Sequence, residues 1–263
     1  MPKVCVCVKY SLDVSEVRVD PSTRQPVTVG VKRKVSDFDK NAVEEAVRLK
    51  ERLGWTVTAL TYGPDEAKSA LREALAMGAD EAVLVSDPGY AQSDTLVTSL
   101  FLAEAIKRVG PFNLILLGEA SIDGYTYQVG PRLAERLGMP QVTHVRRLEV
   151  KDGEVVAERD LEDGYELVSV KMPVVVTVTK EVNEPRYPKL MDIMKASRKP
   201  IKTLTAADLG IPEGKRGAAG SGIEVLKALA PEMKRREQII KGKEPADAAA
   251  ELIELLVKEG VVR

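Results

Sequence analysis

Residues 114–131 read LILLGEASIDGYTYQVGP, which combines a short apolar run, a polar loop with glycines and the beginning of a helical segment predicted over residues 126–137. An apolar run of this kind is typical of a parallel strand that is covered on both faces. Glycines close to a helix N-terminus leave backbone N–H groups free for an anion such as a phosphate ester. From the residues alone, a phosphate-binding loop and a plain strand-to-helix connection are equally well supported.

The same alternation of strand and helix runs through the first half of the chain. Apolar runs rich in branched residues predict further strands over residues 4–8, 56–60 and 82–85. Segments of helical period predict helices over residues 41–53, 65–77 and 94–108, the first with a capping-box start at residues 36–39. This order predicts an α/β fold, with a doubly wound, mostly parallel, Rossmann-like sheet and right-handed crossovers.

Several β features interrupt or follow this alternation. Residues 17–31 predict a small hairpin with a Pro-containing turn. Alternating polar and apolar residues predict strands over 146–150, 154–160 and 166–171, which would form an antiparallel extension of the sheet. Residues 173–179 are the most β-branched run and should return to the main sheet. Beyond residue 188 we expect no further strand.

The C-terminal part of the chain differs in composition from the rest. We predict a nucleotide-binding α/β domain over residues 1–211, a Gly-rich linker over 212–222 and a C-terminal arm over 223–263. The arm should contain helices over residues 223–229 and 245–257. Helices this short hold no core of their own, so we expect the arm to pack on a partner subunit, with packing on its own domain as the alternative.

The scarce residues exclude several kinds of chemistry. One histidine, His144, and two cysteines, Cys5 and Cys7, cannot build a four-ligand structural zinc site, and no Gly-x-Ser-x-Gly motif of a serine hydrolase is present. Cys5 and Cys7 alternate along one predicted strand, so both should be buried on one sheet face without a disulfide. With 39 Lys and Arg against 40 Asp and Glu, the 263-residue chain has no basic excess to bind nucleic acid.

The chain also has no signal-peptide pattern and no apolar run of roughly 18 residues that could cross a bilayer. Together with the expected free cysteines, this predicts a cytoplasmic protein that is not an integral membrane protein.

Ligands of doubly wound sheets bind beyond the carboxyl ends of the strands, where the strand order reverses. The residues that directly follow the predicted strands are therefore candidates for a binding site: 9–11, 62–64, 86–87 and 118–120. No Walker A motif and no Gly-x-Gly-x-x-Gly motif is present, and the glycines of residues 217–222 follow no strand.

Several motifs resemble the beta subunit of electron transfer flavoprotein. They are Asp37-Phe38 before AVEEAVRLKE (residues 42–51), ALAMGAD (74–80), LLG (116–118) with Ile122-Asp123, and NEPRY (183–187) with IMKA (193–196). Their order and spacing are similar to those of that family over residues 1–211, and residues 159–177 also resemble the family's signature.

The resemblance implies a heterodimer with a larger alpha subunit, which carries the electron-transferring FAD in a mobile domain. The beta subunit of this family holds AMP or, in electron-bifurcating members, a second FAD. Carried over to this sequence, the cofactor-binding residues are Cys7, Val8, Ser36, Phe38, Asp39, Tyr62, Ser121, Asp123, Gly124, Tyr125, Thr126, Gln128, Val129 and Gly130. The resemblance implies neither a catalytic side chain nor a metal.

Residues 123–131, DGYTYQVGP, look like the bifurcating subgroup, which favours FAD over AMP and implies NADH as a substrate that is oxidised only together with the alpha subunit. Gly124 would let a pyrophosphate approach the backbone, and the Thr126 hydroxyl can donate to a phosphate oxygen. His144 either approaches the edge of the flavin or is a structural histidine.

The resemblance further implies a docking segment for redox partners, which would be an acyl-CoA dehydrogenase or quinone oxidoreductase and a ferredoxin-type acceptor. This segment comprises Val182, Asn183, Glu184, Pro185, Arg186 and Tyr187. Two alternatives share the sheet: a stand-alone adenine-nucleotide-binding module, which would lack the docking segment and the arm, and an ATP pyrophosphatase, which needs a Ser-Gly-Gly-x-Asp-Ser loop that residues 9–13 do not provide.

Overall fold

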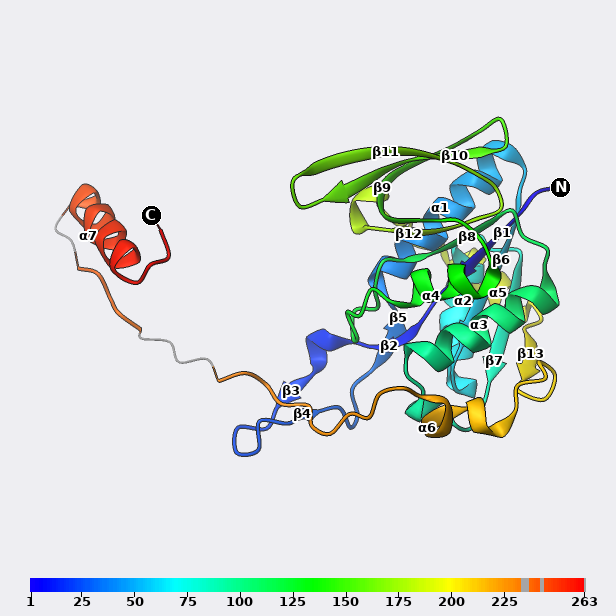
Figure 1. The fold of residues 1–263 in the computed structure, drawn as a ribbon, viewed down its shortest axis with the longest axis horizontal. Coiled ribbons are helices and arrows are strands. Elements are labelled where there is room, and N and C mark those ends of the chain that lie inside the picture. The colour runs from blue at the N-terminus through cyan, green and yellow to red at the C-terminus, as the bar shows by residue number, and fades with distance from the viewer. Residues whose placement is uncertain (233–236, 242–243, 263) are drawn as a thin grey trace.

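The computed structural model describes residues 1–232, 237–241 and 244–262, and most of them form an α/β body around one large sheet (Figure 1). Within these residues the main sheet contains β1 (Lys3–Cys7), β6 (Thr56–Tyr62), β7 (Glu81–Ser86), β8 (Leu114–Gly118), β9 (Gln141–Lys151), β10 (Glu154–Leu161), β11 (Gly164–Lys171), β12 (Val174–Val178) and β13 (Lys202–Thr205). The helices are α1 (Asp37–Leu53), α2 (Lys68–Met77), α3 (Thr95–Val109), α4 (Val129–Leu137), α5 (Leu190–Arg198), α6 (Gly217–Gly220) and α7 (Pro245–Lys258).

The strand order is β11-β10-β9-β12-β8-β1-β6-β7-β13, with parallel pairing from β9 to β13 wherever partners are assigned. After β1, the next strands of the main sheet, β6 and β7, are added on one side of β1. The following strands, β8 and β12, are added on the other side. The strand order therefore reverses between β1 and β8. The prediction of a doubly wound, mostly parallel sheet is confirmed, and so is its antiparallel extension through β9, β10 and β11.

Two apolar layers hold helices against the two faces of the sheet. One layer joins α1 and α2 to alternate residues such as Val4 and Val6 of β1. The other joins α3 and α4 to the opposite face and includes Cys5, Cys7 and the fully buried Phe101. Burying one such large side chain contributes about 1.5–3 kcal/mol. Both cysteines lie free on one face, as the alternation predicted.

Two small sheets fill the insertion between β1 and α1. Strands β2 (Tyr10–Leu12) and β5 (Arg33–Val35) pair at its base. Strands β3 (Arg18–Val19) and β4 (Pro26–Val27) form the predicted hairpin beyond them.

Two helix starts differ from the predicted ones. Ser36 precedes α1, but its hydroxyl accepts a hydrogen bond from Ile122 N at 3.2 Å and caps no helical N–H, so the predicted capping box does not form. Helix α4 begins at Val129 rather than at residue 126, because Tyr125 and Tyr127 adopt left-handed backbone angles with φ of 48° and 57°. Residues in that conformation do not continue a right-handed helix.

The expectation that no strand follows residue 188 is wrong, because β13 pairs in parallel with β7 at the edge of the sheet. Its sequence, Lys-Thr-Leu-Thr, buries only Leu204. An edge strand with one buried side chain has too little apolar pattern to be recognised from sequence.

The C-terminal part also differs from its prediction in two places. Residues 212–222 contain two short helical turns, Glu213–Lys215 and α6, and they lie against α3, where Gly222 N donates to Asp94 Oδ2 at 2.8 Å. The predicted helix over residues 223–229 is absent, since seven residues without a packing surface cannot sustain a helix. The second predicted helix exists as α7, whose side chains all remain at least partly exposed.

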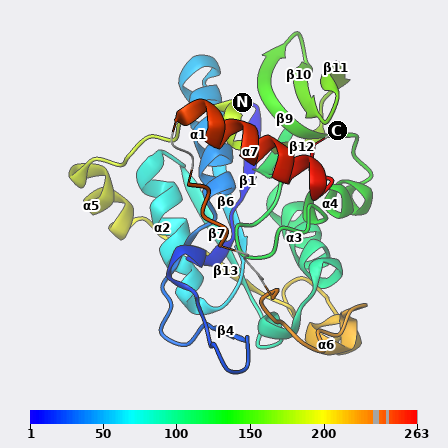
Figure 2. The ribbon, with the colours of Figure 1, turned by 90° about the vertical axis from the view of Figure 1, so that its left-hand side faces the viewer.

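Helix α7 stands clear of the α/β body in Figure 1 and projects toward the viewer in Figure 2. Among the described helices, none combines the length and apolar character needed to cross a membrane.

Helix α4 should tolerate no side chain at Gly130. A Cβ at this position would overlap Thr177 Cγ2 of β12, and Thr177 is β-branched, buried and bonded through its Oγ1 to His144 N. We expect Gly130→Ala to lower the free energy of unfolding by about 1–3 kcal/mol, outweighing the gain of up to about 1 kcal/mol that alanine gives inside a helix. Gly164→Ala has open space around its Cβ and serves as the control in chemical denaturation. Equal stability of both variants would contradict the close packing of α4 on β12.

Candidate functional site

The buried carboxylate of Asp39 lies at the point where the strand order reverses. Asp39 Oδ2 accepts from Lys9 N at 2.7 Å, and Asp39 Oδ1 accepts from Gly118 N at 3.0 Å. One side chain in the first turn of α1 therefore binds Lys9, two residues beyond β1, and Gly118, the last residue of β8. Burial raises the pKa of Asp39 to about 7, against the two backbone hydrogen bonds, which favour the charged form.

Gly118 is required by the same junction. A Cβ on Gly118 would lie 2.6 Å from Phe38 Cβ and 2.7 Å from Asp39 Oδ1. Only glycine lets the end of β8 approach the start of α1 this closely.

A polar cradle lies beside this junction, formed by Lys9 and the loop that follows β8. Lys9 Nζ donates to Asp123 Oδ1 at 2.6 Å and to Ser121 Oγ at 3.3 Å, while Leu12 N donates to Asp123 Oδ2 at 3.3 Å. Burial alone would raise the pKa of Asp123, but the Lys9 ammonium and these hydrogen bonds lower it overall. A Cβ on Gly124 would lie 3.0 Å from Ser121 Oγ and 3.9 Å from Lys9 Nζ, so the glycine keeps the cradle open.

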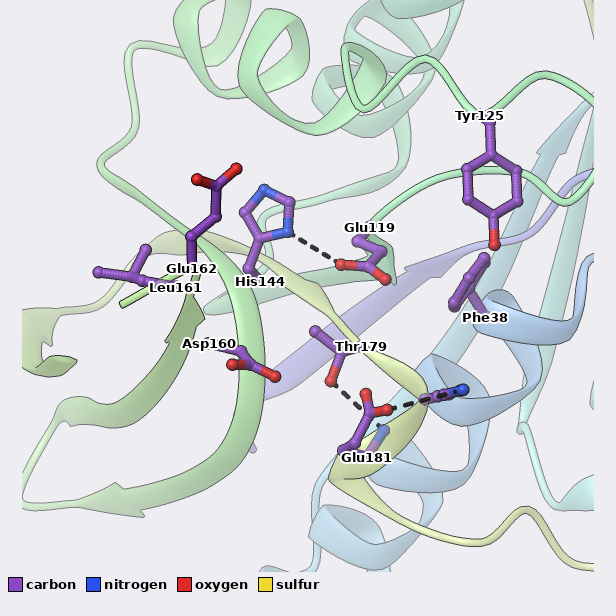
Figure 3. A pocket seen from close by; sticks show the side chains of 10 residues that line it. Phe38, Glu119, Tyr125, His144, Asp160, Leu161, Glu162, Thr179 and Glu181 are labelled. Carbon is purple, nitrogen blue, oxygen red and sulfur yellow. Dashed lines mark hydrogen bonds and ion pairs between the residues drawn. The ribbon is translucent and has the colours of Figure 1, made fainter. Parts of the chain in front are cut away.

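A cavity of about 390 Å³ adjoins the cradle and opens between β8, β9, β10 and β12 (Figure 3). It is lined by Phe38, Glu119, Tyr125, His144, Asp160, Leu161, Glu162, Thr179, Lys180 and Glu181.

Aromatic rings run along one side of this cavity. The ring centroids of Phe38 and Tyr125 are 5.7 Å apart, those of Tyr125 and Tyr127 are 5.7 Å apart, and those of Tyr127 and His144 are 5.5 Å apart. The cradle for an anion thus lies next to a space suited to a flat ring.

The remaining residues of the predicted loop lie at the N-terminus of α4. Thr126 is exposed, and Gln128 Oε1 accepts from Thr95 Oγ1 at 2.7 Å and from Arg132 Nε at 3.3 Å. Val129 and Gly130 open the helix, which has no side-chain cap. The uncapped N–H groups at this end are available to an anion.

Three predicted cofactor residues lie in the core instead of the cavity. Cys7 and Tyr62 belong to one apolar layer and Val8 to the other. The Tyr62 ring stacks on Phe101 with centroids 4.4 Å apart, and its hydroxyl lies 2.9 Å from Ser93 Oγ. The structure therefore brings together the residues around Ser36, Asp39 and 121–126, while these three side chains serve packing at the neighbouring strand ends.

The predicted docking segment is fastened to α1 along its length. The Asn41 side chain donates to Asn183 O at 2.7 Å, and the Arg186 guanidinium donates to Glu44 at 2.8 Å and Glu51 at 2.6 Å. Burial would raise the pKa of Glu44, but hydrogen bonds from Arg186 and Arg48 lower it overall.

Exposure varies along this segment. Val182 is partly buried against the core, whereas Tyr187 is 94% exposed. A second cavity, of about 630 Å³, lies between the segment, the start of α1 and the C-terminal half of α2, where Lys40 and Glu73 line it together with Asn183, Pro185 and Arg186.

From the sequence, Lys9 and Glu119 are candidates only because they follow predicted strands, and the role of His144, at the flavin or in the structure, stays open. The structure adds Lys9 to the cradle and brings His144 Nδ1 within 2.9 Å of Glu119 Oε2 in the cavity. The signal for Lys9 was its position directly after the strand predicted over residues 4–8. No local signal pairs Glu119 with His144, because β12 brings β8 and β9 together across the sheet. Within the described residues no cluster of metal-ligating side chains is found.

Comparison with known proteins gives consistent matches. Residues 25–209 match the model of the electron transfer flavoprotein domain. The chain is 42% identical over 260 residues to electron transfer flavoprotein subunit beta of Thermoanaerobacterium thermosaccharolyticum, covering 98% of this chain and 99% of the relative. It is 38% identical over 261 residues to the caffeyl-CoA reductase-Etf complex subunit CarD of Acetobacterium woodii, covering 99% of this chain and 100% of the relative. Subunit beta from Bacillus subtilis is 38% identical over 258 residues, which is 98% of each chain.

Replacing Asp39 should change how stability depends on pH. Because burial raises the pKa of Asp39 from 3.8 to about 7, the folded state holds its proton more tightly than the unfolded state. The protonated Asp39 side chain therefore contributes to the free energy of unfolding in full below pH 4. As the pH rises through about 7, this contribution, on the order of 4 kcal/mol, is lost. We expect Asp39→Asn to remove this loss, so that its stability relative to wild type increases from pH 4.5 to pH 7.5 in chemical denaturation. Asp37→Asn, at the exposed first residue of α1, is the control; parallel curves for wild type and Asp39→Asn would contradict the buried carboxyl.

Proposed function

The chain belongs to the electron transfer flavoprotein family as a beta subunit, and on this basis we propose that it holds a second FAD for flavin-based bifurcation of electrons from NADH. Its partner would be the larger alpha subunit, which carries the electron-transferring FAD. The runner-up is a non-bifurcating beta subunit that holds AMP as a structural nucleotide. A stand-alone adenine-nucleotide-binding module remains a distant alternative.

One observation carries the choice of FAD over AMP: a ring-lined cavity of about 390 Å³ adjoins the polar cradle. AMP needs only a phosphate site and a place for adenosine. FAD needs room for a pyrophosphate and, beyond it, for a flat ring system. The side of the cavity formed by Phe38 and Tyr125 is next to the cradle of Lys9, Ser121 and Gly124, so one elongated ligand could occupy both.

The residues present fit such a ligand. The Lys9 ammonium, the Ser121 and Thr126 hydroxyls and the uncapped start of α4 offer donors to phosphate oxygens. Asp123 would oppose a phosphate if it were unpaired, but its ion pair with Lys9 offsets this charge. When bound, the flavin would supply the redox chemistry, and this chain's residues would fix its position. The positions of Tyr62, Cys7 and Val8 at the ends of β6 and β1 would shape the adenosine side by packing.

The C-terminal arm supports a heterodimer. We propose that residues 1–211 are the nucleotide-binding domain and that residues 223–263 extend from it to pack on the alpha subunit. The large apolar side chains Leu252, Ile253 and Val257 of α7 are all exposed. An apolar helix face that stands away from its own body needs another surface to cover it.

We also propose that the segment Val182, Asn183, Glu184, Pro185, Arg186 and Tyr187 forms part of the docking surface for redox partners. These would be an acyl-CoA dehydrogenase or quinone oxidoreductase and a ferredoxin-type acceptor. The relative CarD is, by its name, a subunit of a caffeyl-CoA reductase complex, which supports delivery of electrons to an enzyme of CoA esters. The hydrogen bond from Asn41 to this segment, and those from its Arg186 to Glu44 and Glu51, hold the segment rigid, which lowers the entropic cost of docking.

Counting nucleotides tests the choice of cofactor. The full chain is co-expressed with the alpha subunit of its own electron transfer flavoprotein, the complex is denatured and the released nucleotides are separated by chromatography. We expect two FAD and no AMP per heterodimer. One FAD with one AMP would overturn the bifurcating assignment and leave the simple electron carrier.

Docking is tested at Tyr187, because Val182 is partly buried and its substitution would disturb packing. We expect Tyr187→Asp to slow electron delivery to the partner enzyme by about tenfold, the effect of one lost interface anchor, while the flavin content stays the same. Tyr165→Asp makes the same change at another exposed tyrosine, on β11, and should leave delivery unchanged. If both variants slow delivery alike, or if Tyr187→Asp loses flavin, Tyr187 is not a docking residue.

A further inference from the structure

The cavity next to the cradle is surrounded by unusual backbone conformations. Within the described residues, six non-glycine residues have positive φ. Two of them, Tyr125 and His144, line this cavity, and a third, Tyr127, packs against both of their rings. A left-handed conformation costs energy for residues with bulky side chains, and such residues concentrate at ligand sites. Their rings touch in sequence, so the three conformations shape one side of one space.

His144 is directed to this cavity by irregular pairing on both sides of β9. Against β12, the register shifts between Val176 and Val178, and His144 N donates to Thr177 Oγ1 at 3.1 Å. Against β10, the register shifts between Glu158 and Arg159. A β-bulge adds one residue to a strand and turns a side chain away from the regular alternation. The φ of 56° at His144 belongs to this bulge.

Glu119 fixes the orientation of the imidazole ring. His144 Nδ1 and Glu119 Oε2 are 2.9 Å apart, and Figure 3 shows the second ring nitrogen on the opposite edge of the ring. With Nδ1–H donated to the carboxylate, Nε2 remains to contact a ligand.

The other charged groups at the cavity are mainly acidic. They are Glu119, Asp160, Glu162 and Glu181, with Lys180 as a base that pairs with Glu181 at 3.8 Å. Among the lining residues, His144 therefore offers a ring nitrogen, Nε2, that can accept a hydrogen bond from an N–H group of a flat ring.

We infer that His144, oriented by Glu119, binds the polar edge of the flavin ring and that Glu119 is a positioning residue acting through His144. This inference rests on the proposed FAD function and assigns the cavity to the riboflavin half of the ligand. The order of the strands supports this division. Tyr62 ends β6 on one side of the junction, whereas the ends of β8 and β12 and the bulge of β9 surround the cavity on the other side.

The test compares two ligands with the full chain in complex with its alpha subunit, after removal of the nucleotide from the beta subunit. FAD binding is followed by quenching of flavin fluorescence and by the visible absorbance of the bound flavin. ADP binding is followed by competition. ADP shares the adenosine and pyrophosphate of FAD but lacks the riboflavin, so it controls for folding and for the phosphate cradle.

We expect His144→Phe, which keeps a ring but removes both nitrogens, to weaken FAD binding about tenfold, the effect expected for one hydrogen bond. ADP binding should not change. His144→Gln keeps a hydrogen-bond acceptor, its amide oxygen, and should recover most of the FAD affinity. Glu119→Ala should weaken FAD binding less than His144→Phe, and the double variant should be no weaker than His144→Phe alone, because Glu119 acts through His144.

Two outcomes overturn the inference separately from the proposed function. If FAD and ADP are both weakened equally by His144→Phe, or if FAD binding is unchanged, the cavity does not bind the flavin edge through His144, while FAD remains the cofactor. If wild type binds ADP but takes up no FAD, the proposed function and the inference are both wrong.

Discussion

The whole arrangement depends on one buried carboxylate. Asp39 accepts hydrogen bonds from the backbone after β1 and from the end of β8, and it does so from the first turn of α1. A parallel sheet leaves the N–H groups at its carboxyl edge without strand partners where neighbouring strands diverge, and a buried N–H without a partner costs free energy. Asp39 satisfies two of them at the position where the strand order reverses. The close approach of Gly118 to α1, the direction of the loop beyond it and the location of the Lys9 cradle all follow from this junction.

Much of this architecture follows from local sequence patterns. The central strands are short runs of branched apolar residues, and the helices between them repeat apolar residues at helical spacing, so the doubly wound sheet and its ligand edge are predictable. The patterns fail where a structure depends on distant contacts. Strand β13 forms because β7 offers an edge, and residues 223–229 form no helix because their side chains stay exposed. The capping box fails because the Ser36 hydroxyl binds Ile122 N, which is far away in sequence.

The residues of the candidate site also fall into those that the sequence predicts and those that depend on distant contacts. The loop that holds Ser121, Asp123 and Gly124 could be named from its position after a predicted strand, whereas Asp39 could be named only from the family resemblance. The structure brings these residues together around Lys9. The contact of Glu119 with His144 could not be predicted, since it depends on bulges in β9 whose position is set by pairing with β10 and β12. The family resemblance also places Cys7, Val8 and Tyr62 at the site. It does not say whether their side chains contact a ligand or only lie at the ends of strands next to it. Burial shows that their side chains belong to the core.

The exposed arm has a consequence for how the protein is made in the cell. Helix α7 stands clear of the α/β body and presents Leu252, Ile253 and Val257 to solvent. Such a surface on a newly synthesised chain invites self-association and cleavage by proteases until something covers it. The lifetime of the free chain is therefore limited by how soon a covering surface is available. An excess of this chain over its partner would be removed rather than stored, which favours synthesis of the two in matched amounts.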